Sequence, residues 1–161
     1  MRYRLAALAF LAIAMGCAGV NSAPPAVQET LVGIESLGFR CGEGEADNVP
    51  SGLYQWRCKG EFDGVGSTVL VDGNPVGVAG ITMVTDNSTD PNVARTAFAR
   101  LVSNVPPLRT APVLAETLGS WSGEQTSQVV GGVRIFAECA DSMCRVMVND
   151  AADPLRPLPL P

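Results

Sequence analysis

The sequence contains no histidine and only one lysine, Lys59. Histidine is the commonest general base near neutral pH and a frequent metal ligand. Its absence excludes Ser-His-Asp triads, Cys-His nucleophile pairs and histidine metal sites. A single lysine leaves little scope for a phosphate-binding loop or Schiff-base chemistry. The catalytic mechanisms that remain open are those that use carboxylates alone.

Charged and aromatic residues are also scarce, at 17% and 6% of the chain, whereas hydrophobic residues make up 47%. This balance is typical of a globular domain, and 161 residues are enough for one domain with a core of its own. The net charge of −5 repels phosphate backbones and anionic lipid surfaces. We therefore expect no nucleic-acid partner.

No apolar run is long enough to cross a bilayer as a helix. The run at residues 5–15, which follows Arg2 and Arg4, is shorter than the roughly 20 residues that such a helix needs. A basic start, a short apolar stretch and small residues are the layout of a secretory signal. The sequence thus predicts a signal peptide at residues 1–16.

The signal ends in Ala14-Met15-Gly16-Cys17, which resembles a bacterial lipobox. The resemblance implies that Cys17 becomes the acylated N-terminus and anchors the protein in a membrane. Ordinary cleavage after Ala18 or Ala23 is the alternative.

Five cysteines are present, an odd number for an exported protein. If Cys17 carries the lipid, four cysteines remain. Residues 133–139 and 144–149 alternate between apolar and polar residues, which predicts a hairpin with a four-residue loop in which Cys139 faces Cys144. The other disulfide is then Cys41–Cys58. A metal site made of these thiols is the rival interpretation, but their spacing lacks the paired C-x2-C motifs of zinc ribbons, and we predict no metal or cofactor.

The predicted fold class is α+β, with helices packed on one face of an antiparallel sheet. The first helix starts at Val27 and ends at Gly38, and the second starts with Asp90 as N-cap and Pro91 as its first residue. Further elements are expected as strands at 54–58, 68–71 and 76–85, a third helix at 110–121, and the cysteine hairpin. The predicted order is α-β-β-β-α-α-β-β, with two disulfides.

The predicted domain plan has a tether at residues 17–26, one α+β domain at 27–150 and a Pro-rich tail at 151–161, expected to be extended and solvated. The chain contains the motifs Leu37-Gly38-Phe39-x-Cys41, Trp56-x-Cys58 and Asp90-Pro91. In these features it is similar to a group of uncharacterised bacterial lipoproteins. The resemblance implies no activity.

The acidic residues are the candidates for chemistry. Glu43, Glu45 and Asp47 lie in one glycine-rich segment. Such carboxylates work as acid and base or bind calcium, and a solvated acidic loop is the simpler interpretation. Asp86, Ser88 and Asp90 have calcium-like spacing, but helix capping explains Asp90 better.

Two tryptophans and a tyrosine are the other candidates. We expect Tyr54, Trp56 and Trp121 to lie in the core rather than to form a ligand platform.

We predict a membrane-tethered binding or accessory lipoprotein without catalytic residues, which faces the periplasm or the cell exterior and resembles an inhibitor in its role. Its partner would be an envelope protein, a glycan or a small ligand. The alternative is an envelope hydrolase that cleaves glycans with a pair of carboxylates. Such a pair would come from the set Glu43, Glu45, Asp47, Glu61 and Asp63.

Overall fold

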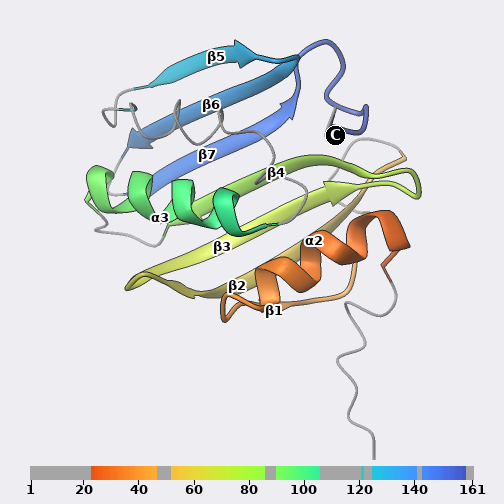
Figure 1. The fold of residues 1–161 in the computed structure, drawn as a ribbon, viewed down its shortest axis with the longest axis horizontal. Helices are drawn as coiled ribbons and strands as arrows, with labels where there is room; N and C mark the ends of the chain where they lie inside the picture. The colour runs from red at the N-terminus through yellow and green to blue at the C-terminus, as the bar shows by residue number, and fades with distance from the viewer. Residues whose placement is uncertain are drawn as a thin grey trace, which may run out of the picture.

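The computed structural model describes residues 23–46, 52–85, 90–105, 121, 125–140 and 143–158. Within these residues, two helices lie on one face of a single antiparallel sheet (Figure 1). The helices are α2 (Pro25–Glu35) and α3 (Pro91–Asn104). The strands are β1 (Arg40–Cys41), β2 (Tyr54–Phe62), β3 (Val65–Gly73), β4 (Val78–Thr85), β5 (Thr126–Val130), β6 (Val133–Ala140) and β7 (Met143–Asp150).

The sheet consists of two meanders joined at their middle. Its strand order is β1-β2-β3-β4-β7-β6-β5, so β1–β4 form one half and β5–β7 the other. The two halves meet where β4 pairs with β7, for example at Ile81 and Val148. The helix α3 lies in the connection between the halves and contacts both β3 and β7. The sheet is therefore continuous although each half is built from local hairpins.

Two hairpins turn through two residues with positive φ. Asp63 and Gly64 have φ angles of 53° and 78°, and Gly131 and Gly132 have 59° and 83°. Positive φ at both central positions is the requirement of a type I′ turn, whose twist matches that of the flanking strands. These dipeptides therefore set the pairing of Phe62 with Val65 and that of Val130 with Val133.

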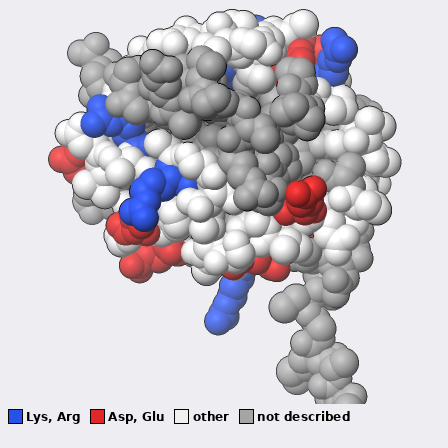
Figure 2. Space-filling model, in the orientation of Figure 1, with Lys and Arg blue, Asp and Glu red and all other residues white. Residues whose placement is uncertain are grey.

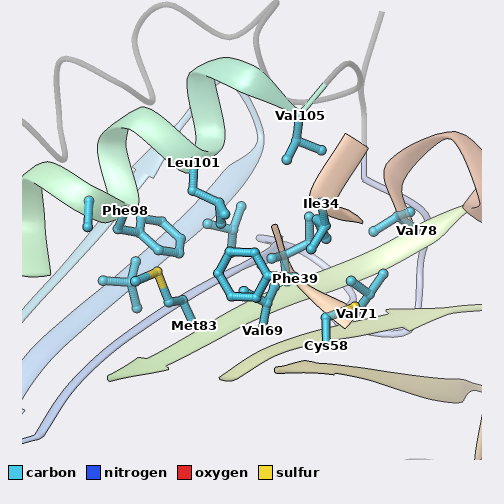
Figure 3. Close-up of a cluster of buried hydrophobic side chains, with 14 of the residues drawn as sticks. Ile34, Phe39, Cys58, Val69, Val71, Val78, Met83, Phe98, Leu101 and Val105 are labelled. Carbon is cyan, nitrogen blue, oxygen red and sulfur yellow. The ribbon is translucent and has the colours of Figure 1, made fainter. Parts of the chain in front are cut away.

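The core lies between the helices and the sheet. The stripe of α3 that faces the sheet is buried and contains Ala94, Ala97, Phe98 and Leu101. Figure 3 shows Phe98 and Leu101 above the strand residues Met83 and Val69, which are also buried. Because α3 spans the junction, this cluster ties both halves of the sheet into one core.

The predicted helices at Val27 and Asp90 are confirmed. Asp90 caps α3 through its carboxylate, which accepts a hydrogen bond from the Asn92 N–H at 2.7 Å. The chain leaves α2 through a turn that ends at Gly38, whose φ of 97° suits glycine. Both disulfides are formed as predicted, and the hairpin register of Cys139 with Cys144 is confirmed.

The predicted element order is matched only in part, because two strands were missed. The order of the described elements is α-β-β-β-β-α-β-β-β. The short β1 has only two residues, and β5 (Thr126–Val130) is a polar edge strand without an alternating apolar pattern. The predicted third helix falls mostly outside the described residues; Trp121, which is described, is buried but lies in no helix.

The C-terminal segment packs against the sheet, which differs from the expected solvated tail. The Leu158 side chain is buried, and its backbone N–H donates to the Val78 carbonyl oxygen at 2.8 Å. Pro157 lies beside Gly77 in the turn between β3 and β4. The segment is therefore attached by a buried side chain, a backbone hydrogen bond and a proline contact.

Candidate functional site

A pocket of about 420 Å³ opens beside the start of β2, near the β1 edge of the sheet. This volume lies within the range of small-ligand sites. The lining residues come from four parts of the chain that meet at one end of the sheet, where α2 begins and β3 turns into β4 (Figure 1). They are Pro24, Glu43, Gly44, Tyr54, Trp56 and Pro75.

A β-bulge brings Glu43 and Gly44 into this pocket. Beyond β1, the Gly42 N–H donates to the Arg57 carbonyl oxygen, whereas Glu45 exchanges both backbone hydrogen bonds with Gln55. Two residues on the outer segment therefore oppose Trp56 alone, which is the definition of a bulge. Bulges redirect side chains at sheet edges, and this one places an acidic residue and a glycine beside the indole.

The indole of Trp56 forms the floor of the pocket and lies close to the backbone of two glycines. A Cβ at Gly44 would lie 2.8 Å from the indole Nε1, and one at Gly73 would lie 3.4 Å from Cζ3. Both positions therefore let the backbone approach a ring that is only 3% exposed. The Nε1–H has no hydrogen-bond partner among the described residues, and this donor lies directly beneath Gly44.

Tyr54 forms a wall that is open to solvent. It lies two residues before Trp56 on the same face of β2, and the two ring centroids are 6.2 Å apart with the planes tilted by 43°. The Tyr54 residue is 46% exposed, in contrast to the buried indole. An exposed tyrosine face beside a buried tryptophan offers a ligand an aromatic surface at the pocket mouth.

Glu43 supplies the negative charge at the pocket. It is exposed, and none of the described residues forms an ion pair with it. Pro24 and Pro75 add apolar walls without side-chain donors or acceptors. The pocket thus combines an aromatic wall, an apolar lining and one carboxylate.

Of the predicted carboxylates that the structure describes, Glu61 and Asp63 lie away from Glu43. Asp47 lies outside the described residues. Glu61 is five positions beyond Trp56 along β2, about 17 Å at the rise of a strand, and Asp63 forms an ion pair with Arg100 at 2.7 Å. Paired glycosidase carboxylates are about 5–10 Å apart, so neither Glu61 nor Asp63 is placed to work with Glu43.

The calcium-like spacing is explained by other contacts or is not described. Asp86 and Ser88 lie outside the described residues, and Asp90 caps α3. No group of three or more metal-binding side chains occurs in the part of the chain that the structure describes.

Two carboxylates outside the pocket have shifted pKa values. Partial burial raises the pKa of Asp72, an effect that the hydrogen bond from Gln55 Nε2 at 2.8 Å opposes. Hydrogen bonds from the backbone N–H groups of Asp153 and Ala152 lower the pKa of Asp150. Asp150 thereby organises the turn after β7, which is a structural role.

Trp56 is buried in the core, as expected, and it also lines the pocket, so a core position and a place beside a ligand are combined in one residue. Sequence analysis missed the contributions of Pro24, Gly44 and Pro75, which are far apart in the chain. The local signal was the Gly42-Glu43-Gly44 run next to an alternating strand, a composition that suits a bulge at a sheet edge.

Known protein-family models, curated proteins and solved structures were compared with the chain, and none matches. Among the described residues, no helix is both long and apolar enough to span a membrane. The two disulfides indicate a protein that lies outside the reducing cytoplasm.

Proposed function

We propose that the chain is an exported lipoprotein, tethered to a membrane by an acylated Cys17, and that its domain is a binding or accessory module. The observation that carries the binding role is the pocket. There a bulge places Glu43, and β2 places the exposed Tyr54, beside the buried indole of Trp56. Small-ligand sites are concave and mostly apolar with a few placed polar groups, and this pocket has that composition.

The cysteine pairing supports the tether. Four cysteines are used in two disulfides, which leaves Cys17 as the one cysteine outside them. An odd cysteine in an exported protein calls for a separate role, and the lipobox-like Ala14-Met15-Gly16-Cys17 supplies one. Cys17 itself lies outside the described residues.

A binding role has more support than the alternative carboxylate hydrolase. Glu61 and Asp63 are remote from the pocket, and Asp63 is neutralised by Arg100. Glu43 is exposed to solvent, whereas the general acid of a glycosidase is usually enclosed in an apolar site. An inhibitor-like or adaptor module needs only a surface that recognises its partner.

Fractionation of cells that produce the Cys17→Ser variant tests the tether. The wild-type chain should sediment with membranes and carry the mass of attached acyl chains, whereas the variant should lose both. Each buried CH2 of an acyl chain contributes roughly 0.8 kcal/mol to membrane binding. A variant that stays membrane-bound with an unchanged N-terminal mass would rule out the lipid anchor.

Binding at the pocket is tested separately with the released Cys17→Ser chain and isolated envelopes. The chain should bind envelopes saturably, and Tyr54→Ala should weaken this binding because it removes the exposed aromatic wall. The control is Val129→Ala, which shortens a side chain that is also exposed, on the far edge strand β5. Equal binding by both variants and the parent would contradict the pocket as the binding site.

A further inference from the structure

We infer that the pocket accepts an organic cation, an alkylammonium or guanidinium group held between the Tyr54 ring and the Glu43 carboxylate. This inference rests on the proposed binding function and names its ligand class. Two sources share the chemistry: the Lys or Arg side chain of a protein partner, and a small quaternary ammonium such as a choline group.

The charge at the pocket favours a cation over an anion. Among the described lining residues Glu43 is the only one with a charged side chain, and none of the described residues forms an ion pair with it. The chain as a whole carries a net charge of −5. An anionic ligand would therefore meet repulsion at both short and long range.

The aromatic geometry adds a second attraction for the same ligand. A cation within about 6 Å of a ring centroid is drawn to the negative face of the ring, by roughly 0.5–2 kcal/mol depending on solvent exposure. Tyr54 is half exposed, while the Trp56 ring beneath it is buried close to Gly44 and Gly73. The exposed Tyr54 ring is therefore the aromatic surface that a cation would meet, with the Trp56 ring tilted by 43° behind it.

The rest of the lining suits the carbon part of such a ligand. Pro24 and Pro75 present apolar surface. Among the described lining residues, the side-chain donors are the Tyr54 hydroxyl and the indole Nε1–H, which Gly44 covers. A sugar needs several donors and acceptors for its hydroxyl groups, and this lining offers few. A lysine, arginine or choline group needs one carboxylate and apolar contact along its stem.

Binding is measured with choline and butylammonium on the full chain in an uncharged detergent, by calorimetry and by the fluorescence of Trp56. Trp121→Phe makes Trp56 the only tryptophan for the fluorescence experiment, and calorimetry on the unaltered chain shows whether that change disturbs the pocket. Each cation is paired with an uncharged alcohol of matching size and shape, 3,3-dimethyl-1-butanol for choline and 1-butanol for butylammonium.

Both cations should bind saturably, more tightly than their alcohols, and should lose affinity as salt is added. Glu43→Gln should weaken binding about tenfold, equivalent to 1.4 kcal/mol, and Tyr54→Leu should weaken it by a similar factor. The matched control is Glu45→Gln, which removes an equal charge from the same segment but not from the pocket lining. It should retain near-parental affinity.

The outcomes separate the cation inference from the proposed function. If the alcohols bind as tightly as the cations, the site is a ligand pocket but the cation inference is wrong. If no probe of either kind perturbs Trp56 or releases heat, both the inference and the pocket are wrong, whereas the Cys17 tether stands on its own test. Equal losses in Glu43→Gln and Glu45→Gln would show general charge attraction and overturn the specific site.

The two sources of the cation are distinguished by competition. Choline binding that short Lys- or Arg-containing peptides displace points to a protein partner, and choline binding that they leave unchanged points to a small ammonium ligand. Either result supports the shared chemistry.

Discussion

The two disulfides join cross-strand neighbours on the helix-covered side of the same sheet, but they hold different kinds of strand. Cys41–Cys58 spans 17 residues and fastens β1, which pairs with β2 at only two positions. Cys139–Cys144 spans 5 residues and closes a hairpin that is paired along all eight residues of each strand.

The consequences of losing each bridge therefore differ. The segment after Cys41 carries the bulge with Glu43 and Gly44, and beyond Cys41–Cys58 it is attached to β2 by few backbone hydrogen bonds. The β6–β7 hairpin is held on its other side by β4, and the Thr85 hydroxyl accepts the Cys144 N–H at 2.8 Å. One disulfide positions the candidate site, whereas the other reinforces a strand pair that is already well held.

The largest expected effect comes from a substitution in the core that both halves of the sheet share, and it should destabilise both halves together. Phe98→Ala should lower the free energy of unfolding by about 3–5 kcal/mol, because Phe98 is 1% exposed in the core that α3 shares with both halves. Denaturant unfolding followed by tryptophan fluorescence measures the loss. Separate transitions for the two halves in this variant would contradict a single core.

The Cys41→Ser/Cys58→Ser double variant should come next. In the chain-entropy description, a 17-residue loop is worth about 3 kcal/mol. Cation affinity should also fall, because the bulge loses its nearest covalent attachment. Thermal unfolding and calorimetric binding are the two measurements, and unchanged binding in the folded variant would show that the bulge does not depend on this bridge.

The Cys139→Ser/Cys144→Ser double variant sharpens the contrast. Its shorter loop predicts a loss of about 2 kcal/mol, and the complete β6–β7 ladder should keep the native register. Pocket affinity should remain at the parental level, because none of the lining residues belongs to β5–β7. A loss of binding as large as that in the other double variant would erase the distinction between the two bridges.

The same contrast explains which parts of the fold could be predicted from the sequence. The Cys139–Cys144 hairpin was predicted with its register because apolar and polar residues alternate on both strands, so a one-residue shift would expose the apolar face. The structure extends pairing to Ala140 and Met143, which shortens the predicted loop. The Asp90-Pro91 start of α3 was equally clear, because the cap and the proline are local signals.

The missed elements depend on contacts between distant residues. The strand β5 contains Thr126, Ser127 and Gln128, and its Val129 is exposed, so no apolar face marks it; backbone pairing with β6 holds it. The pocket likewise depends on a bulge that can be seen only when the segment after Cys41 is aligned with β2. Composition alone does not specify such an alignment.

Gly44→Ala tests the bulge and should lower the free energy of unfolding less than the preceding variants do. The new Cβ would lie 2.7 to 2.9 Å from three indole atoms of Trp56, so either the edge segment or the ring must shift. We expect a loss of about 1–2 kcal/mol, in the lower part of the range for overpacking because the segment lies at a sheet edge. Cation affinity should fall as Glu43 moves.

Gly42→Ala is the matched control for this substitution. A Cβ there would meet only the Arg57 carbonyl oxygen at an ordinary 3.7 Å. If both variants lose the same stability and affinity, close approach to the indole is not what requires glycine at position 44.

The smallest effects concern one carboxylate in each half of the sheet, and they should have opposite signs. Burial raises the pKa of Asp72 in β3 above 3.8, so folding favours its protonated form. Relative to Asp72→Asn, the parent should lose stability as pH rises from 3.8 to the raised pKa, because the unfolded state binds fewer protons over that interval.

The pKa of Asp150 at the end of β7 is lowered by its backbone donors. Relative to Asp150→Asn, the parent should gain stability as pH rises from the lowered pKa to 3.8, keep that gain above 3.8, and lose it again on acidification. Urea unfolding of the parent and both variants at a series of acidic pH values measures the two differences. Differences of the same sign would mean that one of the two environments is assigned wrongly. Opposite signs would show that partial burial destabilises the charged form of Asp72 in the β1–β4 half, whereas backbone N–H groups stabilise the charged form of Asp150 in the β5–β7 half.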